Sequence, residues 1–318
     1  MCEHVRADCL LYRREETSMS CLQVTQLHKQ LGPQYVIKNV SFTLQPNTAT
    51  ALIGANGAGK TTILSMLAGL LEPTMGTVHM PDVKDRRTAI GFLPQYPKFF
   101  SWMTALEYVE MAGSLHGMRK KESTQRAKEV LQFTGLAEHM HKRIETFSGG
   151  MKQRLGISQA IVHKPKLLLL DEPVSALDPI GRRDIMSLLT KLQQTTTILY
   201  STHILHDAEQ MTDQLLFLKD GELVEQGTLL DVKKKYAAPR IELVFATETE
   251  AQQFTSEHIA IATTHGKQVE LTIQGGEPTM QQVLAHLAST SFEVERVAYA
   301  NTTLDDIFMK VAGKHETI

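Results

Sequence analysis

The stretch LIGANGAGKTTILSMLAGL, residues 52–70, constrains the fold of this chain more strongly than any other part of it. It contains the pattern Gly54-x4-Gly59-Lys60-Thr61 between an apolar run and a segment with helical periodicity. Glycine is required where successive backbone N–H groups turn inward around phosphate oxygens, because a Cβ would block that concavity. The loop also leads into a helix N-terminus, which favours an anion. We therefore expect Lys60 to reach the β- and γ-phosphates of a nucleotide and Thr61 to offer its hydroxyl to Mg²⁺.

Four short apolar runs each end in a polar residue or a glycine. They are ALIG at Gly54, IGFLPQ at Gln95, LLLLDE at Glu172 and TTILYSTH at His203. Amphipathic helical segments separate them, and this alternation predicts an α/β fold with buried parallel strands. Ligands of open α/β sheets bind beyond the carboxyl ends of the strands. The four segments are therefore expected to converge on one site.

Two further motifs carry chemistry. The leucine run before Asp171 and Glu172 fits a strand buried on both faces, yet two consecutive carboxylates are costly to bury unless they meet a cation or a reacting water. Asp171 is then the carboxylate on the Mg²⁺ side, and Glu172 orients or deprotonates a water. In FSGGMKQRLGISQAI, residues 148–150 open a second amphipathic helix and predict a second phosphate-binding helix end, although a plain serine N-cap explains the isolated motif equally well.

The chain divides into three parts by pattern. Residues 1–18 are expected to be a flexible extension, and residues 19–235 one domain that contains the motifs above. That domain begins with alternating apolar and polar residues up to 47, typical of antiparallel strands, and contains an inserted helical subdomain at about residues 96–160. From residue 240 to residue 318, three strands alternate with three helices and predict a small α/β accessory domain.

Composition excludes several classes of protein. The 318 residues carry a formal charge of −2, so no extended nucleic-acid footprint is expected. No apolar run reaches the roughly 18 residues that span a bilayer, and the first twenty residues lack the features of a signal peptide. The three cysteines all lie in the first 21 residues and form no disulfide framework. These features predict a cytoplasmic protein.

Together, the motifs resemble the ATP-binding subunit of an ABC transporter. In family order they are Walker A at residues 54–61, the Q-loop at Gln95, the signature at residues 148–151, Walker B at residues 167–171 with Glu172, the D-loop at residues 175–178 and the switch His203. The resemblance covers about residues 20 to 230. It implies a P-loop NTPase core of the ABC type, with an antiparallel β subdomain and an inserted helical subdomain.

The resemblance also implies roles for individual residues. Contacts to ATP are implied for Gly54, Asn56, Gly57, Ala58, Gly59, Lys60, Thr61, Thr62, Ser148, Gly149, Gly150 and Asp178. Contacts to Mg²⁺ are implied for Thr61, Gln95 and Asp171, and roles in hydrolysis for Glu172, His203 and Gln95. In the family two subunits stack head to tail, so Ser148 and Gly150 are expected to touch the γ-phosphate held by the partner subunit, and Asp178 to couple the two sites.

Two positions depart from the family pattern. The signature reads Phe-Ser-Gly-Gly-Met where Leu-Ser-Gly-Gly-Gln is commonest, and Met151 is not expected to abolish contact with ATP, because backbone N–H groups carry much of it. Leu31 stands where an aromatic side chain normally stacks on adenine, with Tyr35 four residues later. Either Leu31 makes a weaker apolar contact with the base or Tyr35 takes its place.

The segment IGFLPQYPKFFSWMTALEYVEMAGSLHGM, residues 90–118, and the terminal TTLDDIFMKVAG resemble the branch of bacterial ABC exporters that handles drugs, antibiotic peptides, ions or lipids. Phe99 and Trp102, with Phe100, are expected beside the groove that receives a membrane subunit, unless these aromatic side chains simply pack the helical subdomain. The implied partners are an integral membrane permease and a second ATP-binding subunit, identical or different, at the cytoplasmic face of the cell membrane.

Two other functions fit the sequence less well. A soluble ABC ATPase acting on ribosomes or DNA would be expected to carry two cassettes in tandem or a long coiled-coil insertion, and the chain has one cassette without heptads. A regulator that binds ATP without turnover is disfavoured by the presence of Glu172 and His203. The predicted activity is thus ATP hydrolysis that powers transport.

Overall fold

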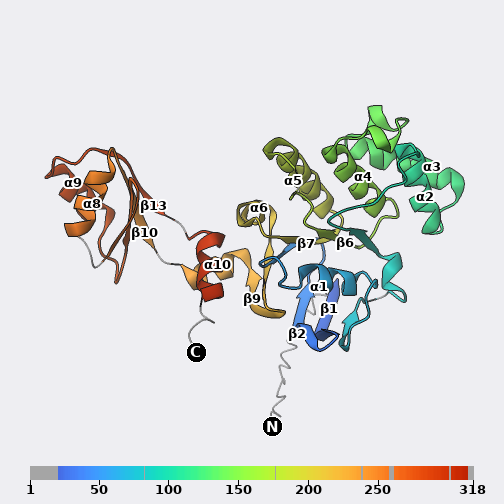
Figure 1. Cartoon of the computed structure of the whole chain (residues 1–318), viewed down its shortest axis with the longest axis horizontal. Coiled ribbons are helices and arrows are strands. Elements are labelled where there is room, and N and C mark those ends of the chain that lie inside the picture. The colour runs from blue at the N-terminus through green and yellow to red at the C-terminus, as the bar shows by residue number, and fades with distance from the viewer. Residues whose placement is uncertain are drawn as a thin grey trace, which may run out of the picture.

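The computed structural model describes residues 21–313 except 82, 176, 238, 258–260 and 301. The predicted N-terminal extension at residues 1–18 lies outside the described residues. Figure 1 shows a larger body built on a central sheet and a smaller body at the opposite end, joined by the segment around β9 and α10. Within the described part of the chain, none of the helices has both the length and the hydrophobicity to cross a membrane.

The central sheet has six strands in the order β5-β6-β7-β3-β8-β9. The strands from β5 to β8 pair in parallel, and β9 joins the edge antiparallel to β8. The strands are β3 (Ala49–Ile53), β5 (Ile90–Leu93), β6 (Leu167–Asp171), β7 (Thr197–Thr202), β8 (Gln214–Lys219) and β9 (Glu222–Thr228). The predicted α/β class is confirmed.

Both faces of this sheet are buried, as the strand β6 shows most clearly. All five of its residues are buried, with Leu168 and Leu170 in one apolar core and Leu167 and Leu169 in another. Because successive strand residues point to opposite faces, a run of leucines is the pattern expected of a central strand. Helices of the larger body are α1 (Lys60–Leu67), α5 (Pro179–Gln193), α6 (Leu205–Met211) and α7 (Leu229–Tyr236).

An antiparallel sheet precedes and flanks α1. Its order is β2-β1-β4, with β1 (Leu22–Leu31), β2 (Gln34–Leu44) and β4 (Met75–His79). The inward side chains of β1 and β2 share an apolar core with Ile63, Leu64 and Leu67 of α1. The alternating pattern at the start of the chain therefore forms the antiparallel pairing that it predicted.

The inserted helical part contains α2 (Ala105–Leu115), α3 (Lys120–Phe133) and α4 (Gly149–Ile161) around a core of its own. A capping box starts α2, since Thr104 and Glu107 satisfy each other's backbone N–H groups. Phe99 packs edge-on against Tyr108 at 5.2 Å, whereas Trp102 is 67% exposed. Of the two aromatics expected at a docking groove, Phe99 thus belongs to the helical core and Trp102 lies on the surface.

The smaller body is a four-stranded antiparallel sheet in the order β11-β12-β10-β13. Its elements are β10 (Arg240–Phe245), α8 (Glu248–Glu257), β11 (Ala262–His265), β12 (Gln268–Thr272), α9 (Met280–Ala288) and β13 (Val294–Ala300). The sequence pattern predicted three of these strands and missed β11, which pairs with β12 around Gly266. A separate apolar core, centred on Phe245 and Phe254, holds this sheet to its helices.

The last helix, α10 (Leu304–Gly313), follows β13 in the chain but packs elsewhere. Leu304, Ile307 and Val311 are buried in the core that covers one face of the central sheet. In Figure 1 the helix lies between the two bodies. The final helix of the expected accessory segment therefore contacts the larger body.

Candidate functional site

The loop between β3 and α1 has the backbone geometry that its glycines predict. Gly59 adopts φ 105°, in the left-handed region, and a Cβ there would lie 2.5 Å from the Ile37 side chain. A Cβ at Gly54 would lie 2.4 Å from the Leu218 carbonyl oxygen. Lys60, the first residue of α1, donates from Nζ to the carbonyl oxygens of Gly54 and Ala55 at 2.8 and 3.0 Å. Its ammonium group therefore lies within the curve of the loop.

The carboxylate of Asp171 is held at the end of β6 by hydroxyl groups on both sides. Thr61 Oγ1 donates to Oδ2 at 2.8 Å, and Ser201 Oγ donates to Oδ1 at 2.6 Å. Asp171 is only 2% exposed, so these bonds offset the cost of burying a charged group. Register explains the second bond, because Asp171 and Ser201 are paired residues on the parallel strands β6 and β7.

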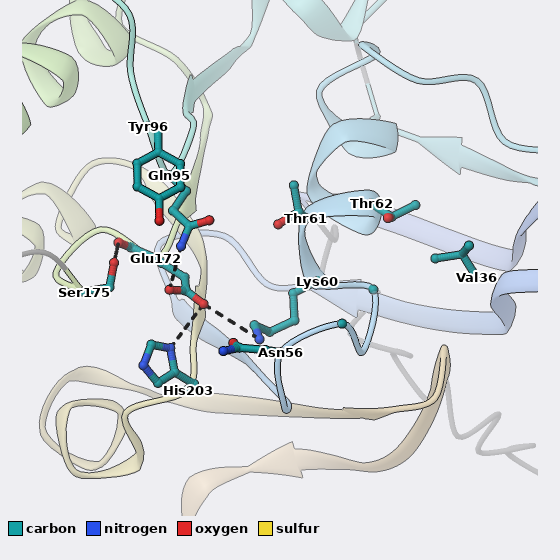
Figure 2. Close-up of a pocket in the computed structure, with 12 residues that line it drawn as sticks. Val36, Asn56, Lys60, Thr61, Thr62, Gln95, Tyr96, Glu172, Ser175 and His203 are labelled. Atoms are coloured by element: carbon teal, nitrogen blue, oxygen red, sulfur yellow. Dashed lines mark hydrogen bonds and ion pairs between the residues drawn. The ribbon is translucent and has the colours of Figure 1, made fainter. Parts of the chain in front are cut away.

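Glu172 is the centre of a polar network in the pocket, as Figure 2 shows. Gln95 Nε2 donates to Oε2 at 3.1 Å, and His203 Nδ1 lies 3.2 Å from Oε1. An ionised carboxylate only accepts hydrogen bonds, so Nδ1 of His203 is the donor in this contact. Lys60 Nζ lies 3.9 Å from Oε1. Three of the four predicted strand-end segments thus meet at this one side chain.

The backbone of Glu172 is strained. Its φ of 48° falls in the left-handed region, which costs a non-glycine residue about 1–3 kcal/mol. The N–H of Glu172 donates to Ser201 Oγ at 2.8 Å, and this bond helps to hold the conformation. Such strain persists where the surroundings fix it, and it occurs often at functional sites.

A pocket of about 590 Å³ lies over this network. Its lining comes from the phosphate loop, the ends of β5, β6 and β7, and the strand β2: Val36, Asn56, Gly57, Gly59, Lys60, Thr61, Thr62, Gln95, Tyr96, Glu172, Ser175 and His203. The predicted convergence of four segments is confirmed. The loop amides, one lysine and a carboxylate beside a histidine form a site for a phosphorylated ligand and an attacking water.

The charge of Lys60 responds to this setting. Burial lowers the pKa of Lys60, and the neighbouring carboxylates of Glu172 and Asp171 raise it, with a net shift below the usual value. A cation that is held by carbonyl groups and carboxylates while partly desolvated is well suited to exchange these partners for phosphate oxygens.

The oxygen set around Asp171 fits a magnesium ion. Mg²⁺ prefers carboxylate and hydroxyl oxygens and keeps several waters. Asp171 and Thr61 supply such oxygens 2.8 Å apart, with Thr61 lining the pocket and the Ser201 hydroxyl fixing the other carboxylate oxygen of Asp171. Gln95 is placed across the pocket, where its amide contacts Glu172.

Several predicted nucleotide contacts lie outside this pocket. The described residues that line it include neither Gly54, Ala58 and Asp171 nor Ser148, Gly149, Gly150 and Asp178, and Leu31 and Tyr35 are also absent from the lining. Ser148 caps α4 by accepting from Met151 N at 3.3 Å, and Asp178 caps α5 by accepting from Gly181 N at 3.0 Å. A Cβ on Gly149 would have open space around it. The N-terminus of α4 therefore stands free of the pocket of its own chain.

Sequence reasoning missed three residues of the site. Ser201 bonds both Asp171 and Glu172, while Val36 and Tyr96 line the pocket. The signal for Ser201 is its place two residues before His203 on a strand adjacent to β6, which becomes visible only once the strand register is known.

The fold and the site define a P-loop ATPase of the ABC type. A family model described as ABC transporter matches residues 37–175, and a model for the C-terminal domain of DrrA1-3-like ATP-binding proteins matches residues 227–312. The chain belongs to the family of ABC transporter ATP-binding proteins, and the resemblance inferred from the motifs is confirmed. The second model includes α10 with the accessory sheet.

Several relatives are ABC transporter ATP-binding proteins of bacteria. The bacitracin transport ATP-binding protein BcrA of Bacillus licheniformis is 31% identical over 92% of this chain and 97% of its own length. The linearmycin resistance ATP-binding protein LnrL of Bacillus subtilis is 29% identical over 92% of this chain and 98% of its own length. An uncharacterised ABC transporter ATP-binding protein of B. subtilis, YxlF, is 51% identical over 67% of this chain and 73% of its own length.

Solved structures show the same core. The ATP-binding subunit of an ABC transporter aligns with a TM-score of 0.62 and 29% identity, covering 68% of this chain and 93% of its own. A dimeric ATP-binding cassette in a post-hydrolysis state with ADP and Pi aligns with a TM-score of 0.59 and 29% identity. The alignment covers 65% of this chain and 98% of the cassette chain. This chain is an ATPase, as the motifs predicted.

Proposed function

We propose that this chain is the energy-coupling subunit of an ABC exporter, in which ATP closes a dimer of ATP-binding subunits and hydrolysis reopens it. The observation that carries the proposal is the pair of helix N-termini suited to phosphate, only one of which lines the pocket of this chain. The free α4 terminus at residues 148–150 then serves the nucleotide held by a second subunit, of the same or another kind. The dimeric relative with ADP and Pi supports this arrangement.

Within the site each residue has a distinct task. Backbone N–H groups of residues 56–62 and the ammonium group of Lys60 bind the phosphates of ATP. Mg²⁺ held by Thr61 and Asp171 would neutralise charge on the phosphate oxygens. Glu172 orients the attacking water and takes its proton, and two hydrogen-bond partners keep its carboxylate in place. His203 presents Nε2 toward the γ-phosphate, and Asp178 couples the two sites of the dimer.

A permease is the proposed membrane partner. The names of BcrA and LnrL describe bacitracin transport and linearmycin resistance, which supports an exporter of an antibiotic or a related compound. The exposed side chains of Tyr96, Phe100 and Trp102 lie beside the helical part, and the rings of Phe100 and Trp102 are 5.2 Å apart and tilted by 42°. This aromatic surface is the proposed contact for the permease, which would hold the chain at the cytoplasmic face of the membrane.

Affinity purification of the chain from detergent-solubilised membranes of its own source tests this proposal. We expect a stoichiometric partner with several membrane spans, identified by mass spectrometry. The variant Trp102→Ala should lower recovery of that partner, and Leu115→Ala, at an exposed residue of the same subdomain, should not. Recovery with ribosomal or DNA-repair proteins, and with no membrane protein, would overturn the exporter assignment.

A further inference from the structure

The C-terminal helix α10 contacts the part of the nucleotide site that carries His203. His203 is joined to α6 by Ile204 alone, because α6 begins at Leu205. The Ile204 N–H donates to Thr202 Oγ1 at 2.9 Å, so this connector is short and hydrogen-bonded. The position of α6 consequently sets the position of the His203 backbone.

Glu209 of α6 accepts a hydrogen bond from the first N–H of α10, at Leu304, with a distance of 2.7 Å. Lys233 of α7 pairs with the same Glu209 oxygen at 3.0 Å. A carboxylate at a helix N-terminus satisfies a free N–H group and interacts favourably with the helix dipole. The carboxylate of Glu209 thus links α6 to both α7 and α10.

Apolar packing strengthens this junction. Leu304 and Ile307 are fully buried in the core that also contains Leu205, Ala208 and Met211 of α6. Every turn of α6 therefore contributes an apolar side chain to the core that α10 completes. Met309, on the other side of α10, is 71% exposed and takes no part in this core.

Beyond α6, the helix reaches the outer side of the phosphate loop. Phe308 packs against Phe217 of β8 with ring centroids 6.1 Å apart. A cavity of about 320 Å³ separates Phe308 and Val311 from the loop at residues 55–58. The helix has direct contact with α6 and faces the phosphate loop only across this space, so its mechanical influence falls mainly on the His203 segment.

The helix is also tied to the accessory sheet. Arg240 of β10 pairs with Asp306 of α10 through Nη2 and with Glu270 of β12 through Nη1. Asp306 accepts in addition from the Thr303 N–H at 2.9 Å, which closes the first turn of the helix. A continuous set of contacts thus runs from the accessory sheet through α10 to α6.

We propose that Glu209 and α10 position the His203 segment for hydrolysis and so link the accessory domain to the ATPase site. Glu209 is a positioning residue, because it acts through α6 and does not line the pocket. The inference rests on the proposed role of His203 for its effect on turnover, and on the geometry alone for its effect on α6. It requires no membrane partner.

The test compares Glu209→Ala, which removes the acceptor, with Glu209→Gln, which keeps an acceptor oxygen, and with Met309→Ala as the matched surface control. In the purified full-length chain, Glu209→Ala should lower kcat for ATP roughly threefold to tenfold, the range of couplings carried through packed elements. The dissociation constant for ATP, measured in a Glu172→Gln background, should not change. Glu209→Gln should restore most of the turnover, and Met309→Ala should behave as the unmodified chain.

Hydrogen exchange supplies a readout that does not depend on catalysis. Glu209→Ala should speed amide exchange in residues 203–211 and leave residues 54–62 unchanged. Unchanged exchange in residues 203–211, or equal losses of kcat and ATP affinity, would overturn the inference. If exchange rises as expected while His203→Ala keeps full turnover, the proposed role of His203 fails and the positioning of α6 by α10 stands.

Discussion

The nucleotide site and the accessory sheet differ in where their charged side chains lie. In the nucleotide site, charged groups are buried and depend on one another, since Asp171 and Glu172 share Ser201 as a hydrogen-bond partner. In the accessory sheet the ion pairs lie on the more open face, as with Arg240–Glu270 and Arg296–Glu242, while Phe245 and Phe254 fill the core. A substitution in the site should therefore change chemistry, whereas one in the accessory core should change local stability.

The largest effect is expected for Glu172→Gln. The amide keeps the shape of the side chain but cannot take a proton from water, so kcat for ATP hydrolysis should fall roughly a thousandfold. Binding of ATP should remain, because the phosphate loop is untouched. Phosphate release and nucleotide binding, measured on the same preparation, separate the two steps; hydrolysis within tenfold of the unmodified chain would remove Glu172 from its assigned role.

Lys60→Ala should weaken the binding step itself. The substitution removes a buried cation from the loop, and loss of charged hydrogen bonds of about 1.5–3 kcal/mol corresponds to a roughly 10- to 100-fold weaker dissociation constant. Titration calorimetry with ATP measures this change. Lys164→Ala, at an exposed residue, is the control and should bind normally. An unchanged ATP affinity in Lys60→Ala would contradict the role assigned to its ammonium group.

Phe254→Ala tests the independence of the accessory core. Phe254 is 1% exposed and packs against Phe245 and Phe292 at ring distances of 5.2 and 5.9 Å. Its truncation should cost about 3–5 kcal/mol of local stability. We expect faster hydrogen exchange in β10 and β12 with unchanged ATP affinity, and no such change for Tyr299→Ala, at an exposed residue. A matching loss of ATP affinity would show that the two regions form one cooperative unit.

The smallest effect is expected for His163 of the larger body, which should make the unfolding free energy fall at low pH. Burial, together with the stacked ring of His116 at 3.7 Å, lowers the pKa of His163 to about 4, although the Ile90 carbonyl opposes this shift. His163 is therefore neutral in the folded chain where an unfolded histidine takes up a proton. Its contribution to stability is complete above about pH 6.5 and is lost as the pH falls toward 4.

Urea unfolding at pH 7 and pH 5 measures this contribution. The partial exposure of His163 reduces the expected loss of unfolding free energy to about 1–2 kcal/mol. His163→Gln should lose less stability over the same interval. If both proteins lose the same amount, His163 is not the group responsible.

The comparison also shows what a sequence can predict. The phosphate loop, the buried β6 and the carboxylates at its end could be predicted, because glycine spacing and a leucine run have direct backbone consequences. The role of Ser201 could not, since it depends on the register between β6 and β7. The left-handed conformation of Glu172 likewise depends on contacts between strands that no local pattern encodes.

The C-terminal part shows a second limit. The alternation of strands and helices predicted a helix at the position of α10 but could not indicate which surface it would meet. Contacts made by Leu304 with Glu209 and the core of α6 decide this in the structure. The strand β11 was missed for a different reason, because its four residues are too few to show a clear alternation.

The central claim is that the α4 terminus at Ser148 completes the ATP site of a second subunit. The most direct test is the molecular mass of the Glu172→Gln variant, measured by light scattering with and without MgATP. We expect twice the 35.5 kDa mass of the chain with MgATP, the single mass without it, and loss of the dimer when Ser148→Arg is added. A variant that binds ATP and remains a single chain in the absence of any other subunit would contradict assembly with an identical partner. Failure to dimerise with the ATP-binding subunit that accompanies it in the membrane would contradict the claim itself.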